Sequence, residues 1–69
     1  EASFVLYPDG GQIAISARSM GRVNVQLVME SLGGGGHQSM AGAQLKIGSM
    51  AEAVARVKAA LEKYRRENS

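Results

Sequence analysis

The residues with the clearest chemical potential are four consecutive glycines, Gly33 to Gly36, followed by the only histidine of the chain, His37. A helix needs one glycine to end it, which leaves three glycines to explain. Consecutive glycines leave backbone N–H groups open to close approach, and phosphate is the usual ligand of such groups. The pattern predicts a phosphate- or nucleotide-binding loop in which Gly34, Gly35 and Gly36 present amides and His37 lies at the rim.

Arg18 is the second candidate for phosphate binding, because its planar guanidinium can pair with two phosphate oxygens at once. The glycine tract is neither a Walker loop nor a dinucleotide fingerprint, since no Lys-Ser/Thr pair follows it and the predicted helix precedes it. On these residues alone, an ordinary surface charge at Arg18 and a flexible glycine-rich connector both stay open.

The chain lacks the residues that catalysis would need. It has one histidine, no cysteine and six carboxylates, most of them on predicted helix surfaces or in a turn. These do not form a Ser/His/Asp triad, a matched pair of carboxylates or a metal site. We therefore expect no catalytic residue and no metal ligand in this chain, and no hydrolysis by the chain alone.

The elements that must position these residues follow from the hydrophobic pattern. Residues 3–7 are rich in strand formers, and residues 12–19 alternate so that Ile13 and Ile15 lie on one face and Arg18 on the other. The Pro-Asp-Gly-Gly segment between these runs is typical of a turn. Together they predict a β-hairpin.

A helix, a third strand and a second helix are expected to follow. Asn24 is a suitable N-cap for a helix over residues 25–32, which carries one apolar stripe and which Gly33 ends. Residues 43–47 alternate as a strand. The order β-β-α-β-α predicts a small α+β domain over residues 1–69, with one mixed sheet and two helices packed on one face.

The last helix begins with a capping box, in which the Ser49 hydroxyl and the Glu52 carboxylate each bond the backbone amide of the other residue. Its polar end, residues 65–69, is expected to be a linker or tail. The apolar face that the spacing predicts consists of Met50, Val54, Val57, Leu61 and Tyr64.

Composition limits the cellular location and the class of protein that we expect. The 69 residues carry a formal net charge of +2 and contain no cysteine, and no apolar run approaches the roughly 18 residues of a membrane span. We expect a cytoplasmic domain without direct membrane contact. Because the chain begins at Glu1 rather than methionine, we also expect it to be a piece of a larger protein.

Three segments together resemble a known family. They are Ile15-Ser16-Ala17-Arg18-Ser19, Val23-Asn24-Val25-Gln26, and Leu32 to His37 with Ala41-Gly42 behind it. The series resembles the C-terminal DHH-associated domain of DHH-family phosphoesterases and is most similar to that of the cyclic-di-AMP phosphodiesterases. The resemblance implies a larger enzyme whose preceding DHH domain binds two manganese ions. This domain would contact that DHH domain and hold a nucleotide substrate, cyclic-di-AMP or a short oligonucleotide.

The resemblance also implies roles for individual residues. Arg18 matches the phosphate-contacting arginine of the family. Met40 departs from the pattern, because relatives often have a small residue there, and its side chain would either narrow a base pocket or fill the core. The positions that match the substrate-gripping loop are Gly34, Gly35, Gly36 and His37. The neighbouring positions that also match are Ser16, Ser19 and Asn24.

Two other functions fit the same residues. Gly33–Gly36 satisfies the GxxG pattern of a KH loop, which would make the chain a non-catalytic single-stranded RNA-binding module. Against that function, a KH loop joins two helices, whereas residues 43–47 alternate like a strand. A structural dimerisation domain is the other alternative, with the glycines as a connector. A homodimer, and a membrane anchor in an N-terminal part of the parent, stay open.

Overall fold

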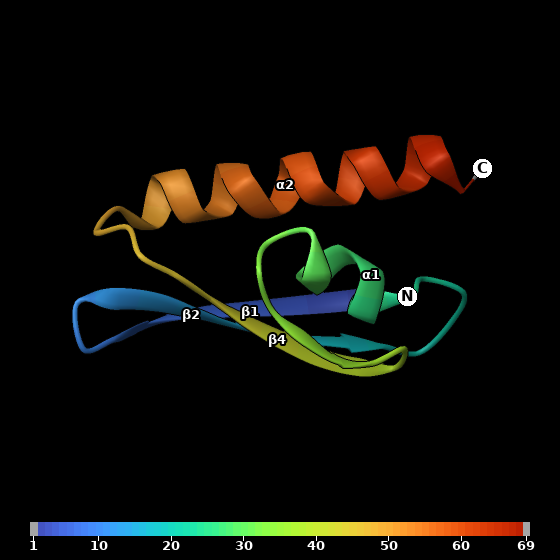
Figure 1. Cartoon of the computed structure of the whole chain (residues 1–69), viewed down its shortest axis with the longest axis horizontal. Coiled ribbons are helices and arrows are strands. Elements are labelled where there is room, and N and C mark those ends of the chain that lie inside the picture. Colours follow the sequence, from blue (N-terminus) through green and yellow to red (C-terminus); the bar gives the residue numbers. More distant parts are fainter. Residues whose placement is uncertain (1, 69) are drawn as a thin grey trace.

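The chain folds into one four-stranded sheet and two helices. The structure is a computed structural model and describes residues 2–68. In chain order the elements are β1 (Ala2–Asp9), β2 (Gln12–Ser19), α1 (Val25–Glu30), β3 (Gly35–His37), β4 (Met40–Leu45) and α2 (Met50–Glu67). The sheet has the strand order β1-β2-β4-β3, and both helices lie on the same face of it (Figure 1). The predicted α+β class is confirmed.

The sheet differs from the expected one in two respects. Each pair of neighbouring strands is antiparallel, so the sheet is not mixed. The glycine tract also supplies a strand of its own, β3, and β4 begins at Met40 rather than at residue 43. A strand of three residues, two of them glycine, carries no hydrophobic alternation. Its pairing with β4 is therefore invisible to pattern analysis.

The turn between β1 and β2 consists of Gly10 and Gly11, whose φ angles are +55° and +83°. Two consecutive residues with positive φ are typical of a type I′ turn, whose twist matches that of the flanking strands. Because this turn is so tight, the strands continue to Asp9 and Gln12, which lie opposite each other. The hairpin is therefore longer than the predicted Pro-Asp-Gly-Gly turn allowed.

The core lies between the sheet and the helices. The alternation predicted for β2 and the apolar stripe predicted for α1 are both confirmed by burial. The buried residues of the three elements that meet there are Ile13, Ile15 and Ala17 on β2, Ala41, Ala43 and Leu45 on β4, and Val25, Val28 and Met29 on α1. Among residues 2–68, no helix lies over the opposite face of the sheet (Figure 1). Arg18 belongs to that face, because it is exposed and alternates with the buried residues Ala17 and Ser19.

The face through which helix α2 packs overlaps the predicted one in part, because Val57 is buried and Leu61 and Tyr64 pack against the core as predicted. Ala53, Val57 and Ala60 are buried, whereas Met50 and Val54 are 37% and 36% exposed. Alanine is scored as weakly apolar in a pattern analysis, but its small side chain lets a helix approach its neighbours closely. The helix also runs on to Glu67, so most of the expected polar tail is helical.

Ser49 is the N-cap of α2. Its hydroxyl oxygen accepts a hydrogen bond from the Glu52 amide at 3.2 Å, while the Glu52 carboxylate lies 3.9 Å from the Arg56 guanidinium. We expect Ser49→Ala to lower the free energy of unfolding by about 1 kcal/mol and the Tm by about 4–8 °C. Thermal denaturation checks this, with Ser3→Ala, which removes an exposed hydroxyl from β1, as the control. Equal losses in both variants would contradict the cap.

Candidate functional site

Arg18, Met40 and His37 lie in one row across three neighbouring strands. Arg18 of β2 is opposite Met40 of β4, and Met40 is opposite His37 of β3. Residues that are directly opposite each other in an antiparallel sheet project from the same face. The three side chains therefore stand together on the helix-free face, and all three are exposed. We call this set the Arg18 row.

The Arg18 row brings a guanidinium and an imidazole within reach of one anion. Neighbouring strands lie about 4.8 Å apart, so two strand spacings separate the backbones of Arg18 and His37 by roughly 10 Å. The long arginine side chain can span much of that gap, and both groups can then contact one phosphate above Met40. Within residues 2–68 the only ion pair joins Glu52 and Arg56, so no carboxylate there occupies the Arg18 guanidinium.

A part of the sheet that is nearly bare of side chains adjoins the Arg18 row. Gly35 of β3 is opposite Gly42 of β4, and Gly42 is opposite Ser16 of β2. Strands β2 and β4 approach closely here, since a Cβ added at Gly42 would lie 2.9 Å from the carbonyl oxygen of Ile15. We call Gly35, Gly42 and Ser16 the glycine floor. A flat ligand can lie against the backbone there.

The first two glycines of the tract end α1. Gly33 has a φ of +85°, and its amide donates to the Glu30 carbonyl oxygen at 3.1 Å. The Gly34 amide donates to the Met29 carbonyl oxygen at 2.8 Å. These two bonds form a Schellman motif. The Gly34 amide is therefore already used within the fold, which corrects the expectation that it is presented to a ligand.

Steric constraints separate the remaining glycines. A Cβ at Gly34 would overlap the carbonyl oxygen of Gly42, and a Cβ at Gly36, whose φ is +145°, would lie 2.6 Å from the Ala41 Cα. A Cβ at Gly35 would meet no atom within 4 Å, and its backbone is not in the positive-φ region. The fold explains three of the four glycines and leaves Gly35 to be explained by function.

Of the three neighbouring candidates, Ser16 and Ser19 lie on β2, whereas Asn24 precedes α1. Ser16 is exposed and belongs to the glycine floor. Ser19 is 8% exposed, and its hydroxyl oxygen accepts from the Gly21 amide at 3.3 Å. The Asn24 side chain caps α1 by accepting from the Leu27 amide at 3.3 Å. Ser19 and Asn24 thus have structural roles, and the structure brings only Ser16 to the Arg18 row.

Met40 is the residue whose place the sequence predicted least well. Its side chain is 52% exposed and stands between Arg18 and His37, so it does not fill the core. The signal was present in the alternation of β4, because Ala41 and Ala43 are buried whereas Met40 projects to the other face. The predicted strand begins at residue 43, so it does not include Met40, the first residue of β4.

Residues 2–68 contain neither a cluster of metal-ligating side chains nor a membrane-spanning helix. No three His, Cys, Asp or Glu side chains come together there in a way that could hold a metal ion. In the same part of the chain, no helix combines the length and the apolar character needed to cross a bilayer. The described residues therefore do not fit a manganese site.

The sheet and its two helices define a small α+β domain whose helix-free face carries an exposed basic row beside a glycine floor. The chain belongs to the DHHA1 domain family, whose model matches residues 1–63. The family resemblance seen in the sequence is confirmed.

The relatives of this chain are much longer proteins. It is 53% identical over 66 residues to the cyclic-di-AMP phosphodiesterase PdeA of Listeria monocytogenes and 51% identical over 65 residues to the cyclic-di-AMP phosphodiesterase GdpP of Bacillus subtilis. Each alignment covers 93% of this chain and 10% of the relative. The chain thus spans about a tenth of the length of the curated relatives that it matches most extensively.

Proposed function

We propose that this chain is the substrate-binding domain of a manganese-dependent DHH-family phosphodiesterase that hydrolyses cyclic-di-AMP or a short linear dinucleotide. Three relatives that are 50% to 53% identical are named as cyclic-di-AMP phosphodiesterases, which supports the substrate class. The observation that carries the proposal is the Arg18 row beside the glycine floor, on a face that no helix covers.

The Arg18 row would hold the phosphodiester. The Arg18 guanidinium can donate two parallel hydrogen bonds to non-bridging oxygens, and the His37 imidazole can donate a third. These donors neutralise the ground-state anion and also favour a transition state in which more charge develops on the same oxygens. The glycine floor lets the sugar or base lie against the backbone without displacing a side chain.

Manganese belongs to the proposal for the whole protein and not to the residues of this chain. The described residues offer no ligand cluster, so a DHH domain elsewhere in the protein would bind the metal and carry out the hydrolysis. That domain is also the proposed partner of the helix-free face. A cytoplasmic location for the domain is part of the same proposal.

The single-stranded RNA-binding alternative has less support. A KH loop joins two helices, whereas the glycine tract here leads from α1 into β3. The dimerisation alternative treats the glycines as a free connector, but close contacts or positive φ angles constrain three of the four. Titration with single-stranded RNA, and sedimentation of glycine-tract variants, test these two alternatives.

We expect Gly35→Val in the full-length protein to weaken cyclic-di-AMP binding by more than about 100-fold, because the added side chain overpacks the surface on which the ligand lies. A valine fits a strand, and its Cβ meets no protein atom within 4 Å, so the fold is expected to stay intact. Isothermal titration calorimetry measures the affinity, and circular dichroism checks the fold.

Gly48→Val is the matched control for this experiment. Gly48 also has open space around its Cβ position and no positive φ, but it lies outside the glycine floor. The control is expected to bind cyclic-di-AMP like the wild type. Wild-type affinity in Gly35→Val would exclude the glycine floor as the binding surface. Binding of RNA without any binding of cyclic-di-AMP by the wild type would favour the RNA-binding module.

A further inference from the structure

Tyr64 of α2 lies beyond the segment that the family model matches, and its hydroxyl is hydrogen-bonded to the chain segment that follows β2. Its hydroxyl oxygen accepts from the Asn24 amide at 2.9 Å and donates to the Arg22 carbonyl oxygen at 3.4 Å. Both partners lie in the connector, residues 20–24, between β2 and α1. Tyr64 therefore ties the last helix to a segment forty residues earlier in the chain.

The residues on either side of this connector are hydrogen-bonded to the turn between β3 and β4. The Val25 amide, at the start of α1, donates to the Gln38 carbonyl oxygen at 3.1 Å. The Ser19 amide, at the end of β2, donates to the Ser39 carbonyl oxygen at 3.0 Å. Since Gln38 and Ser39 form that turn, these bonds set its position relative to β2. The turn directly joins His37 on β3 and Met40 on β4, which are two neighbouring members of the Arg18 row.

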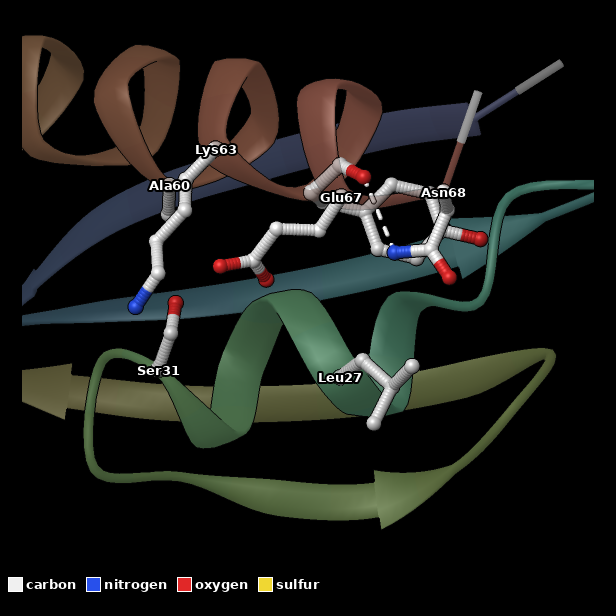
Figure 2. Close-up of a pocket in the computed structure, with 7 residues that line it drawn as sticks. Leu27, Ser31, Ala60, Lys63, Glu67 and Asn68 are labelled. Atoms are coloured by element: carbon white, nitrogen blue, oxygen red, sulfur yellow. Dashed lines mark hydrogen bonds between the residues drawn. The ribbon is translucent and has the colours of Figure 1, made fainter.

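Packing holds only part of the connector, since Val23 packs against the core while the space beside Arg22 is open. A cleft of about 300 Å³ lies between them and the end of α2, and its lining includes Arg22, Gln38 and Tyr64. Figure 2 shows the adjoining hollow between α1 and α2, where the Asn68 side chain donates to the Tyr64 carbonyl oxygen at 2.9 Å. On this open side, the hydrogen bonds of Tyr64 add to the packing of Val23 in holding the connector.

We propose that Tyr64 is a positioning residue for the Arg18 row, an inference that rests on the proposed function. Without the hydroxyl, the Asn24 amide loses its acceptor, and the connector is freed from α2. The hydrogen bond from the Val25 amide to the Gln38 carbonyl oxygen then restrains the turn less firmly, because the start of α1 can move. His37 and Met40, at the two ends of the turn, shift relative to Arg18, and the row no longer presents one fixed geometry to a phosphate.

The test is Tyr64→Phe in the full-length protein, which removes one oxygen atom and keeps the ring. We expect the KM for cyclic-di-AMP to rise about fivefold while kcat changes by less than about twofold, because one hydrogen bond that positions a binding surface is lost. We also expect faster hydrogen exchange, measured by mass spectrometry, in the peptides that cover residues 20–27 and 36–41.

Val57→Ala is the matched control, because Val57 is a buried core residue of the same helix without a hydroxyl. It is expected to lower the Tm and leave the KM unchanged. An equal rise of the KM in both variants, or unchanged exchange at residues 36–41 in Tyr64→Phe, would overturn the proposal.

A failure of the proposed function can be recognised separately. If Arg18→Ala has normal kinetics, the row does not bind the substrate, and the role of Tyr64 in substrate binding falls with it. Faster exchange at residues 36–41 in Tyr64→Phe would still show that the hydroxyl holds the turn. A raised KM together with faster exchange confined to the two peptides supports the whole proposal.

Discussion

Arg18→Ala in the full-length protein is expected to lower kcat/KM for cyclic-di-AMP by about 100-fold or more, since it removes a charged bidentate partner of the phosphate. The Tm should change little, because the side chain is exposed and projects from the helix-free face. Steady-state kinetics and thermal denaturation on the same preparation check both parts. Arg18→Lys should recover only part of the activity, because an ammonium group lacks the planar fork.

His37→Ala is expected to give a smaller loss in the same direction. If both groups contact one phosphate, the losses in the double variant will not add, and a double-mutant cycle measures that coupling. Lys58→Ala is the charge-matched control, since it removes one exposed positive charge from α2. Near-normal turnover in both Arg18→Ala and His37→Ala would end the assignment of the Arg18 row as the phosphate site.

Gly34→Ala is expected to prevent folding of the domain. The added Cβ would overlap the Gly42 carbonyl oxygen and would also lie 2.7 Å from the Ala43 Cα. Both contacts are with the backbone of β4, which cannot move aside without breaking its pairing with β2. We expect a loss of more than about 4 kcal/mol, which is most of the stability of a small domain.

Gly35→Ala is the matched control for this effect, because the same substitution one residue later meets open space. Circular dichroism and thermal denaturation of both variants should show an unfolded domain for Gly34→Ala and a wild-type Tm for Gly35→Ala. A native spectrum and unchanged Tm in Gly34→Ala would show that β3 and β4 are not packed as described.

Features that depend on local sequence were predictable. The alternation of β2, the Asn24 cap and the positive φ of Gly33 after α1 all depend on residues within a few positions of one another, although α1 ends at Glu30 rather than at residue 32. The N-cap of α2 at Ser49 belongs to the same group. In each case the signal is either the backbone preference of one residue type or the spacing of apolar residues along a single element.

Features that depend on pairing between distant segments were not predictable. Strand β3 exists because β4 lies beside it, and nothing in Gly35–His37 alone favours a strand. The face through which α2 packs depends on how closely Ala53 can approach the layer beneath, which a hydrophobic period does not measure.

The candidate site shows the same division. Arg18 and His37 are predicted from residue type together with the family resemblance, because a guanidinium and an imidazole both suit phosphate. That Met40 lies between them follows from β4 pairing with both β2 and β3, a register that the sequence does not reveal. The hydrogen bond that the Gly34 amide donates within the Schellman motif depends on the path of the backbone after α1. Only the structure reveals that path.

The bare face of the sheet has a thermodynamic consequence. A nucleotide resting on this platform would keep its outer half in bulk solvent, where water competes for every phosphate oxygen and ionic screening weakens attraction. Strong retention then requires a second wall that expels this water, and separation of the two walls would let the product escape. A chain that supplies one wall forms half of the binding site, and its affinity for a ligand depends on the part of the protein that faces it.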